Sequence, residues 1–240
     1  MGRPANLPVN SRKERSDILY WNKPGIVEAH GIVVGWLFMK LLFTLIFGFF
    51  IVLIWSVIRP FDLFTWFLEA SPAMAALLLL AVTYKRFRFS NLAYVLIWIH
   101  CVVLLIGAHY TYAEVPLFNW IRDEFGLKRN SYDGVGHFAQ GFFPAIVARE
   151  ILLRKSEIRG RWLPFVVVCI VLAFSAFYEL IEWWVSLATG SIGDAFLGTQ
   201  GDVWDTQKDM ALCLIGSITS LIFLSRLHDK SIVKQLQEHV

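Results

Sequence analysis

The chain alternates between long apolar runs and short polar segments. Six of the runs are long enough to cross the ~30 Å hydrocarbon core of a bilayer, which takes ~20 mostly apolar residues in a helix. They lack the strict alternation of apolar and polar residues that is typical of barrel strands, so the pattern predicts helices. The first run ends at Ile58 and begins between Ile32 and Leu41, and the others cover residues 63–84, 92–112, 133–153, 162–185 and 205–224.

The polar segments divide the chain into three expected parts: a polar N-terminal tail over residues 1–30, a six-helix membrane domain over 31–226 and a C-terminal tail over 227–240. The first tail lacks the short apolar core and cleavage site of a signal peptide, so we expect it to be retained. Pro116 fits the first turn of a short interfacial helix between the third and fourth runs. Residues 186–204, between the fifth and sixth runs, are rich in glycine and contain no Lys or Arg.

Basic residues gather on one side of the expected spans. Fifteen Lys and Arg residues lie in the two tails and in the segments after the second and fourth runs, against four in the segments on the opposite side. Loops that stay in the cytoplasm carry an excess of Lys and Arg. The sequence therefore predicts an all-α integral membrane protein, a six-transmembrane-helix bundle with both termini cytoplasmic.

Composition agrees with a membrane protein and excludes several other classes. Hydrophobic residues make up 57% of the chain and charged residues 17%, whereas a soluble domain is roughly 45–50% apolar and about 25% charged. The 10 Trp and 20 Phe residues exceed what one small soluble core would bury, so membrane lipid is the expected partner. No basic stripe with interleaved aromatics is present, which argues against nucleic acid, and the three cysteines have no metal-ligand spacing.

Acidic and imidazole side chains gather near the outer ends of three expected spans. At ~1.5 Å rise per residue they lie within about two turns of these ends. Within each span they are three or four residues apart and so share a helix face. They are Asp133, His137 and Gln140 on the fourth span, Glu179 and Glu182 on the fifth, and Asp205 and Asp209 on the sixth.

Ionised groups at this depth are costly unless they are paired, protonated or bound to a cation. Oxygen-rich sites with one or two imidazoles suit Mg²⁺ or Mn²⁺, and Zn²⁺ is a further candidate. We therefore expect a divalent metal ion with the candidate ligands His137, Glu179, Asp205, Asp209 and Asp133. The candidate catalytic groups are His137, Glu179 and Asp209, and the candidate substrate-binding groups are Gln140, Glu182, Arg129 and Gln200.

Structural roles remain open for these residues. Asp133 and Asp205 stand where helix N-caps are expected. Glu182 lies one turn nearer the surface than Glu179, where water can reach it. The sequence leaves open whether Glu69 and His109 belong to the same polar site.

A family resemblance is carried by three segments, RNSYDGVGHFAQGFFPAIVARE, SAFYELIEWW and FLGTQGDVWDTQKDM. These segments resemble the YjdF family of bacterial inner-membrane proteins, and the resemblance extends over residues 30–226. The resemblance implies a multi-pass protein of the bacterial inner (plasma) membrane and implies no particular reaction. The order of acidic residues and His137 is also similar to that of the VanZ-like membrane proteins, although Glu182 stands where that pattern usually has Gln. Those proteins are associated with glycopeptide resistance and the cell surface, so the likeness implies a role directed at the envelope.

Three classes of function fit these features. The first is a metal-dependent enzyme that acts on a lipid or lipid-linked envelope substrate at the outer leaflet. The second is a cation or proton transporter, although the inner halves of three spans are almost wholly apolar. The third is a non-catalytic assembly protein whose polar cluster fixes helix packing. The sequence predicts neither the substrate nor the oligomeric state.

Overall fold

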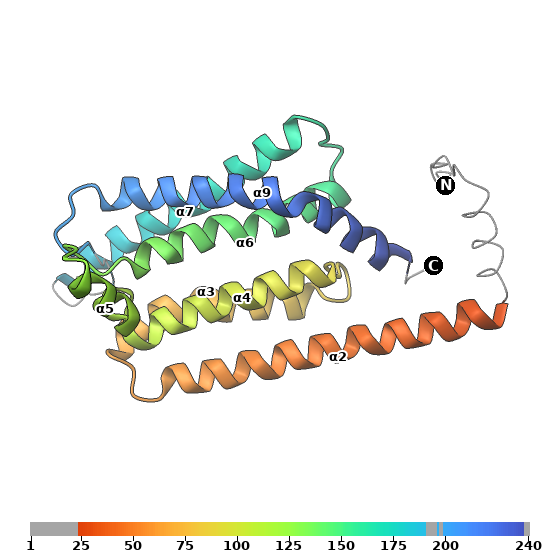
Figure 1. Ribbon diagram of the computed structural model, residues 1–240, viewed down its shortest axis with the longest axis horizontal. Helices are drawn as coiled ribbons and strands as arrows, with labels where there is room; N and C mark the ends of the chain where they lie inside the picture. Colours follow the sequence, from red (N-terminus) through yellow and green to blue (C-terminus); the bar gives the residue numbers. More distant parts are fainter. Residues whose placement is uncertain (1–23, 191–195, 197–198, 238–240) are drawn as a thin grey trace.

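The computed structural model describes residues 24–190, 196 and 199–237, and for residues 24–34 and 236–237 it describes the backbone alone. This part of the chain is helical and contains no β-strand. In chain order the elements are α2 (Pro24–Val57), α3 (Leu63–Thr83), α4 (Asn91–Tyr110), the 3-10 turn η1 (Tyr112–Glu114), α5 (Pro116–Glu124), α6 (Tyr132–Lys155), α7 (Trp162–Thr189) and α9 (Asp205–Gln237). The long helices form one bundle, with α5 at one end and the start of α2 and the end of α9 at the other (Figure 1).

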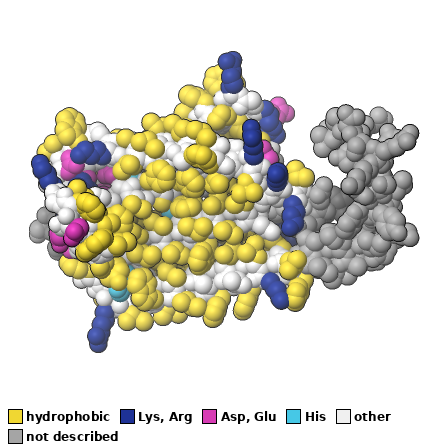
Figure 2. All heavy atoms as spheres, in the orientation of Figure 1, with side chains coloured by type: hydrophobic (Ala, Val, Ile, Leu, Met, Phe, Trp, Pro, Cys, Tyr) yellow, Lys and Arg dark blue, Asp and Glu magenta, His cyan; other side chains and the backbone are white. Residues whose placement is uncertain are grey.

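The bundle has the surface of a membrane protein. Among the described residues, five helical segments are long and apolar enough to span a bilayer: Gly35–Val57, Leu63–Thr83, Asn91–Tyr110, Trp162–Thr189 and Asp205–Gln235. Large hydrophobic side chains cover the middle of the bundle, and basic side chains gather at its ends (Figure 2). The expectation of a helical membrane protein is confirmed.

The remaining expected span, the fourth along the chain, is α6, which has 24 residues and is long enough to cross a bilayer. No stretch of α6 is as apolar as these five segments, and α4, α7 and α9 all pack against it. A helix that is surrounded by other helices can carry polar side chains that a lipid-facing helix cannot.

Two helix boundaries differ from the sequence expectation. Within the described residues, α2 already starts at Pro24, well before the expected range of Ile32 to Leu41. The last helix continues to Gln237 instead of ending at Leu224, and its final turns bury His228 and Ile232. No Gly or Pro follows residue 224, so nothing stops the helix where the apolar run stops. Much of the expected C-terminal tail is therefore helical.

Close packing of α6 on α9 sets the register of the site. The two helices run in the same direction (Figure 1), and a Cβ at Gly141 would lie 2.0 Å from the carbonyl oxygen of Cys213. A Cβ at Gly216 would likewise lie 2.2 Å from the carbonyl oxygen of Phe138. Glycine at both positions lets the two backbones touch. His137 lies one turn before Gly141 and Asp209 one turn before Cys213, so the contact holds these two side chains at the same level.

A second polar cluster holds the bundle together at the opposite end from α5. The Glu150 carboxylate is fully buried and accepts hydrogen bonds from Ser90 N (2.8 Å), Ser90 Oγ (2.7 Å) and Arg154 Nη1 (2.6 Å). His228 Nε2 lies 3.0 Å from Glu150 Oε2, and Arg149 Nη1 lies 3.0 Å from His228 Nδ1. Since Arg can only donate, His228 accepts at Nδ1 and donates from Nε2 to the carboxylate. The cluster joins the start of α4 to α6 and α9.

Candidate metal centre

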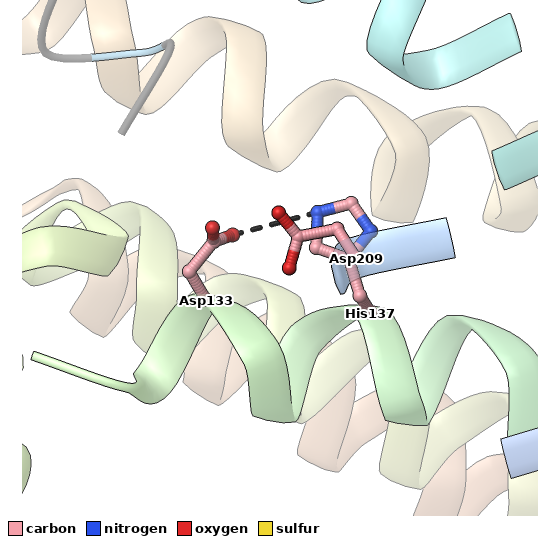
Figure 3. Close-up of side chains that lie close together, drawn as sticks. All are labelled: Asp133, His137 and Asp209. Carbon is pink, nitrogen blue, oxygen red and sulfur yellow. Dashed lines mark ion pairs between the residues drawn. The ribbon is translucent and has the colours of Figure 1, made fainter. Parts of the chain in front are cut away.

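Three helices bring acidic and imidazole groups together at the α5 end of the bundle. Asp133 and His137 come from the first two turns of α6, and Asp209 comes from the first turns of α9 (Figure 3). One possible ligand atom from each lies within 4.8 Å of the other two. The side chains of His137 and Asp209 are 5% and 3% exposed, so bulk water does not solvate them.

Glu179 from α7 completes the group. His137 Nε2 lies 3.5 Å from Asp133 Oδ1 and 3.6 Å from Glu179 Oε1. Both distances exceed those of a good charge-assisted hydrogen bond, which is about 2.7–2.9 Å. The imidazole nitrogen therefore faces two carboxylate oxygens without a close hydrogen bond to either. This arrangement is typical of a site in which all three atoms contact the same bound ion or water.

A cavity of about 70 Å³ adjoins the cluster. A single water needs only ~10–15 Å³ of such space, so several small groups fit. Its polar lining residues come from α3, α4, α6 and α7 and from the turn after α4, and they are Glu69, His100, Tyr112, Asp133, His137, Gln140, Tyr178 and Glu182. Phe196, from the segment between α7 and α9, also lines the cavity. Gln140 and Glu182, two of the residues expected to bind substrate, both line this cavity.

The structure separates Glu69 from His109. Glu69 is 2% exposed, lines the cavity and accepts a 3.2 Å hydrogen bond from the Thr111 hydroxyl. His109 lies elsewhere: its Nδ1 is 3.1 Å from the carbonyl oxygen of Ser56, and its ring stacks on Trp55. Glu69 therefore belongs to the polar site, whereas His109 belongs to the contact between α2 and α4.

Sequence reasoning missed three polar groups in the cavity, namely His100, Tyr112 and Tyr178. His100 lies in the middle of an apolar run with no polar residue at helical spacing, so no pattern marks it. Tyr112 follows α4, where an aromatic residue is typical of the membrane interface. Its ring instead lies between two glycines, because a Cβ at Gly107 or at Gly136 would come within 2.6 Å of it. These two close contacts place Tyr112 inside the bundle, which the sequence alone does not predict.

Several buried polar atoms around the cavity have no hydrogen-bond partner among the described residues. Buried polar groups in proteins are nearly always bonded, so such a concentration indicates a site for water, ions or a ligand. The atoms are Glu69 Oε2, His100 Nε2, His137 Nδ1, Gln140 Oε1 and Glu179 Oε1.

Arg129 holds the acidic residues at the mouth of the cluster. Its guanidinium pairs with Asp205, lies 3.5 Å from Asp202 Oδ2 and lies 3.4 Å from Asp133 Oδ2. Burial lowers the pKa of Arg129, but the Asp205 hydrogen bond and nearby carboxylates raise it above its ordinary value, so the charge is kept. Lys208 pairs with Asp202 and, through its hydrogen bond, lowers the pKa of that carboxyl. Asp205, expected as a ligand, is thus engaged by Arg129, which was expected to bind substrate.

Gln200 also has a defined structural partner. Its Oε1 accepts a 2.9 Å hydrogen bond from Asn130 N, and its Nε2 donates a 3.0 Å bond to Asn130 O. Asn130 is fully buried and in turn donates to Val115 O and Asn119 Oδ1. Gln200, expected to bind substrate, therefore ties the segment before α9 to the segment before α6, which fixes where both helices begin.

The remaining charges are out of balance. Glu69, Glu179, Glu182 and Asp209 form no ion pair with a described Lys or Arg, and His137 lies near two of them, Glu179 and Asp209. Desolvated carboxylates at this density need protons or a cation. The donor set of carboxylate oxygens and one imidazole nitrogen is one that a divalent metal ion accepts.

Comparisons with known proteins place the chain in a family. Residues 41–230 match the family model described as "Predicted membrane protein (DUF2238)". The inner membrane protein YjdF of Escherichia coli (strain K12) is 49% identical over 179 residues, which are 74% of this chain and 86% of that protein. No solved structure matches the chain significantly. The chain therefore belongs to the DUF2238 family, to which the YjdF resemblance pointed, and it is a multi-pass protein of the inner membrane.

Proposed function

We propose that the protein is a metal-dependent membrane enzyme that acts on a lipid or lipid-linked envelope substrate. The observation that carries the proposal is the convergence of Asp133, His137 and Asp209 within 4.8 Å, beside a cavity where several buried polar atoms lack a partner in the described part of the chain. Groups that only fix helix packing satisfy one another, as those around Glu150 do. His137 and Glu179 each keep a buried atom without a hydrogen-bond partner in the described chain, which favours a ligand-binding role over a purely structural one.

The side chains present fit a divalent cation. Asp133, His137 and Asp209 would hold it, with Glu179 within reach of the same imidazole. The histidine favours Mn²⁺ or Zn²⁺, whereas a site for Mg²⁺ usually consists of oxygen ligands alone. Asp205 would act through Arg129, which it holds against Asp133.

The chemistry follows from the positions of these residues. A bound divalent cation supplies a Lewis acid and an activated water. Glu179 is the group placed to accept a proton, because its Oε1 has no other partner. Gln140 and Glu182 line the cavity and would contact the polar part of a substrate. Since Asp133 and Asp209 lie in the first turns of spanning helices, the substrate's polar part would sit at headgroup depth.

We also propose a topology of six spans with both termini cytoplasmic. In it α6 crosses the membrane among α4, α7 and α9, residues 31–226 form the membrane domain, and residues 1–30 and 227–240 lie on the cytoplasmic side. The fifteen-to-four distribution of Lys and Arg supports this orientation. The metal site then faces the outer leaflet.

The packing of α6 argues against transport through the bundle. Between Gln140 and Arg149 the residues facing α7 and α9 form an apolar cluster with Ala145, Val167 and Cys213 at its centre. Eight residues of helix correspond to about 12 Å. On this side of α6, a proton or cation path would meet the Ser175 hydroxyl beside Cys213 and otherwise the apolar groups of the cluster.

Metal-dependent thermal stability tests the proposal. Mn²⁺ or Zn²⁺ at 100 times its Kd should stabilise the purified protein by about 2.7 kcal/mol, or roughly 5–10 °C in Tm. Glu179→Gln, Asp209→Asn and His137→Gln should each abolish the response while the protein still inserts and folds. Their combined effects should be non-additive, because all three serve one ion.

Asp123→Asn provides the matched control, since Asp123 lies on α5 and pairs with Arg122 alone. It should keep the full metal response. A wild-type protein whose Tm is indifferent to metal and to chelation would exclude the metal site and leave the assembly and proton-relay functions.

A further inference from the structure

A second hollow lies in the other half of the bundle, on a different face of α4 from the polar cavity. Helices α2 and α3 both pack along α4, and a groove of about 400 Å³ remains between them. That volume falls within the ~300–1,000 Å³ of ligand sites. The residues that line the groove are apolar or aromatic and come from Met39 to Phe49 on α2, from Leu77 to Ala81 on α3 with Tyr84 just after it, and from Tyr94 to Cys101 on α4.

The dimensions of the groove match one leaflet of a bilayer. The ten-residue step from Met39 to Phe49 corresponds to ~15 Å along the helix, which is half of the ~30 Å hydrocarbon core. Two residues on its rim, Phe43 and Ile46, are 72% and 46% exposed. Because these residues lie within a spanning segment, the groove is accessible from the lipid.

The end of the groove near Tyr84 is positively charged. The Arg88 guanidinium lies 4.9 Å from the centre of the Tyr84 ring, which lines the groove. Lys85 and Arg86 follow Tyr84 directly and are exposed. No acidic residue occurs between positions 70 and 113 or between 35 and 57, so the described side chains of α2 and α4 and this end of α3 contribute no negative charge here.

We propose that the groove binds an acyl chain of an anionic phospholipid whose phosphate lies against the basic residues 85, 86 and 88. An apolar groove one leaflet deep meets acyl chains before any other ligand, and clustered basic residues at a membrane surface attract anionic headgroups. Arg88 and Tyr84 then contact the headgroup and the first part of the chain. This site does not depend on the metal centre, which none of its residues touches.

Native mass spectrometry of the full-length protein in a mild detergent tests this site. The protein is titrated with phosphatidylglycerol or with phosphatidylcholine of identical chains. Leu80→Trp fills the groove, whereas Leu79→Trp adds the same ring at a neighbouring side chain that is 63% exposed and outside the groove. Losing contact with only two methylene groups corresponds to about tenfold in affinity. We expect Leu80→Trp to lower the affinity for the first bound phosphatidylglycerol by at least that factor. Leu79→Trp should bind the lipid as tightly as the wild type does.

A second set of variants tests the headgroup. Replacing Lys85, Arg86 and Arg88 by Gln should remove the preference for phosphatidylglycerol and leave phosphatidylcholine binding unchanged. Replacing Arg159 and Arg161, which are exposed in the segment after α6, should leave the preference intact. Unchanged Tm values in detergent show that the variants fold.

Equal binding by Leu80→Trp and Leu79→Trp would overturn the acyl-chain site. A preference that survives loss of the three basic residues would overturn the headgroup assignment. A wild type that retains no lipid but forms a dimer, which Leu80→Trp dissociates, would instead make the groove an interface between two copies of the chain.

Discussion

Two buried pairs of glutamate and histidine differ in how completely they are satisfied. In one, His228 Nε2 lies 3.0 Å from Glu150 Oε2, and the carboxylate accepts three further hydrogen bonds. In the other, His137 Nε2 lies 3.6 Å from Glu179 Oε1, and both side chains keep a buried atom without a partner among the described residues. The first pair is closed and structural. The second is open, which is what a binding site requires.

The fully bonded pair of Glu150 and His228 predicts that the stability of the fold depends strongly on the negative charge of Glu150. Every neighbour of its two oxygens is a donor, so a Gln amide would place an N–H₂ group against another donor. We expect Glu150→Gln to lower the free energy of unfolding by about 3 kcal/mol, because Arg154 loses its buried partner. Denaturation of the purified protein in detergent measures this.

Glu157→Gln is the control for that measurement, because Glu157 is exposed after α6 and should change stability by less than about 0.5 kcal/mol. An unchanged unfolding midpoint for Glu150→Gln would show that the cluster at this end does not hold the helices together.

At the scale of elements, the site depends on how closely α6 approaches α9. The Gly141 contact with the Cys213 carbonyl is a contact with backbone, which no side-chain rotation relieves. His137 and Asp209 come from these two helices, so their separation follows the helix spacing. Packing and metal binding should therefore change together.

Gly141→Ala tests this coupling. The added methyl group must push the helices apart, at a cost of about 1–3 kcal/mol, and metal affinity should fall as well. Gly35→Ala is the matched control, since nothing lies within 4 Å of the added atom, and it should be neutral or slightly stabilising. Thermal unfolding with and without Mn²⁺ measures both effects. A metal response of normal size in Gly141→Ala would show that helix spacing does not control the site.

The sequence was informative where polar residues recur at helical spacing. The pair Asp133 and His137 could be placed on one face of a helix because four residues make about one turn. The runs of apolar residues likewise located all six long helices. Apolar length could not show where α9 ends, because a helix continues past the apolar run when no breaker follows.

Isolated polar residues could not be assigned from the sequence. Glu69 and Asn130 bond to distant parts of the chain, and His100 shares a cavity with residues of other helices, and no sequence spacing predicts such contacts. For the same reason the engagement of Asp205 by Arg129 was not foreseen, since the two lie 76 positions apart. Helix packing decides which candidate residues share a site.

At the scale of the whole molecule, α6 determines the topology. Its polar face makes it less apolar than the five spanning segments, yet it packs against α4, α7 and α9. If it spans the membrane, the segments before and after it lie on opposite sides. The metal site then faces outwards, and the charged end of the lipid groove faces the cytoplasm.

Labelling with a membrane-impermeant thiol reagent tests this arrangement. Lys128→Cys, before α6, should react in cells whose outer membrane alone is permeabilised, because the reagent reaches the periplasmic face. Arg159→Cys, after α6, should react only once the inner membrane is opened. The unmodified chain, with its own three cysteines, gives the background. Reaction of both sites from the same side would mean that α6 does not span.

Whether His137 is a ligand can be measured directly by pulsed electron paramagnetic resonance of Mn²⁺ bound to the purified protein. A directly coordinated imidazole nitrogen modulates the electron spin echo of the ion. We expect one such nitrogen in the wild type. His137→Gln should lose both this nitrogen signal and the tight binding of Mn²⁺. His109→Gln should keep both, because His109 lies between α2 and α4. Absence of bound Mn²⁺ in the wild type, or a nitrogen signal that survives His137→Gln, would contradict a metal centre at Asp133, His137 and Asp209.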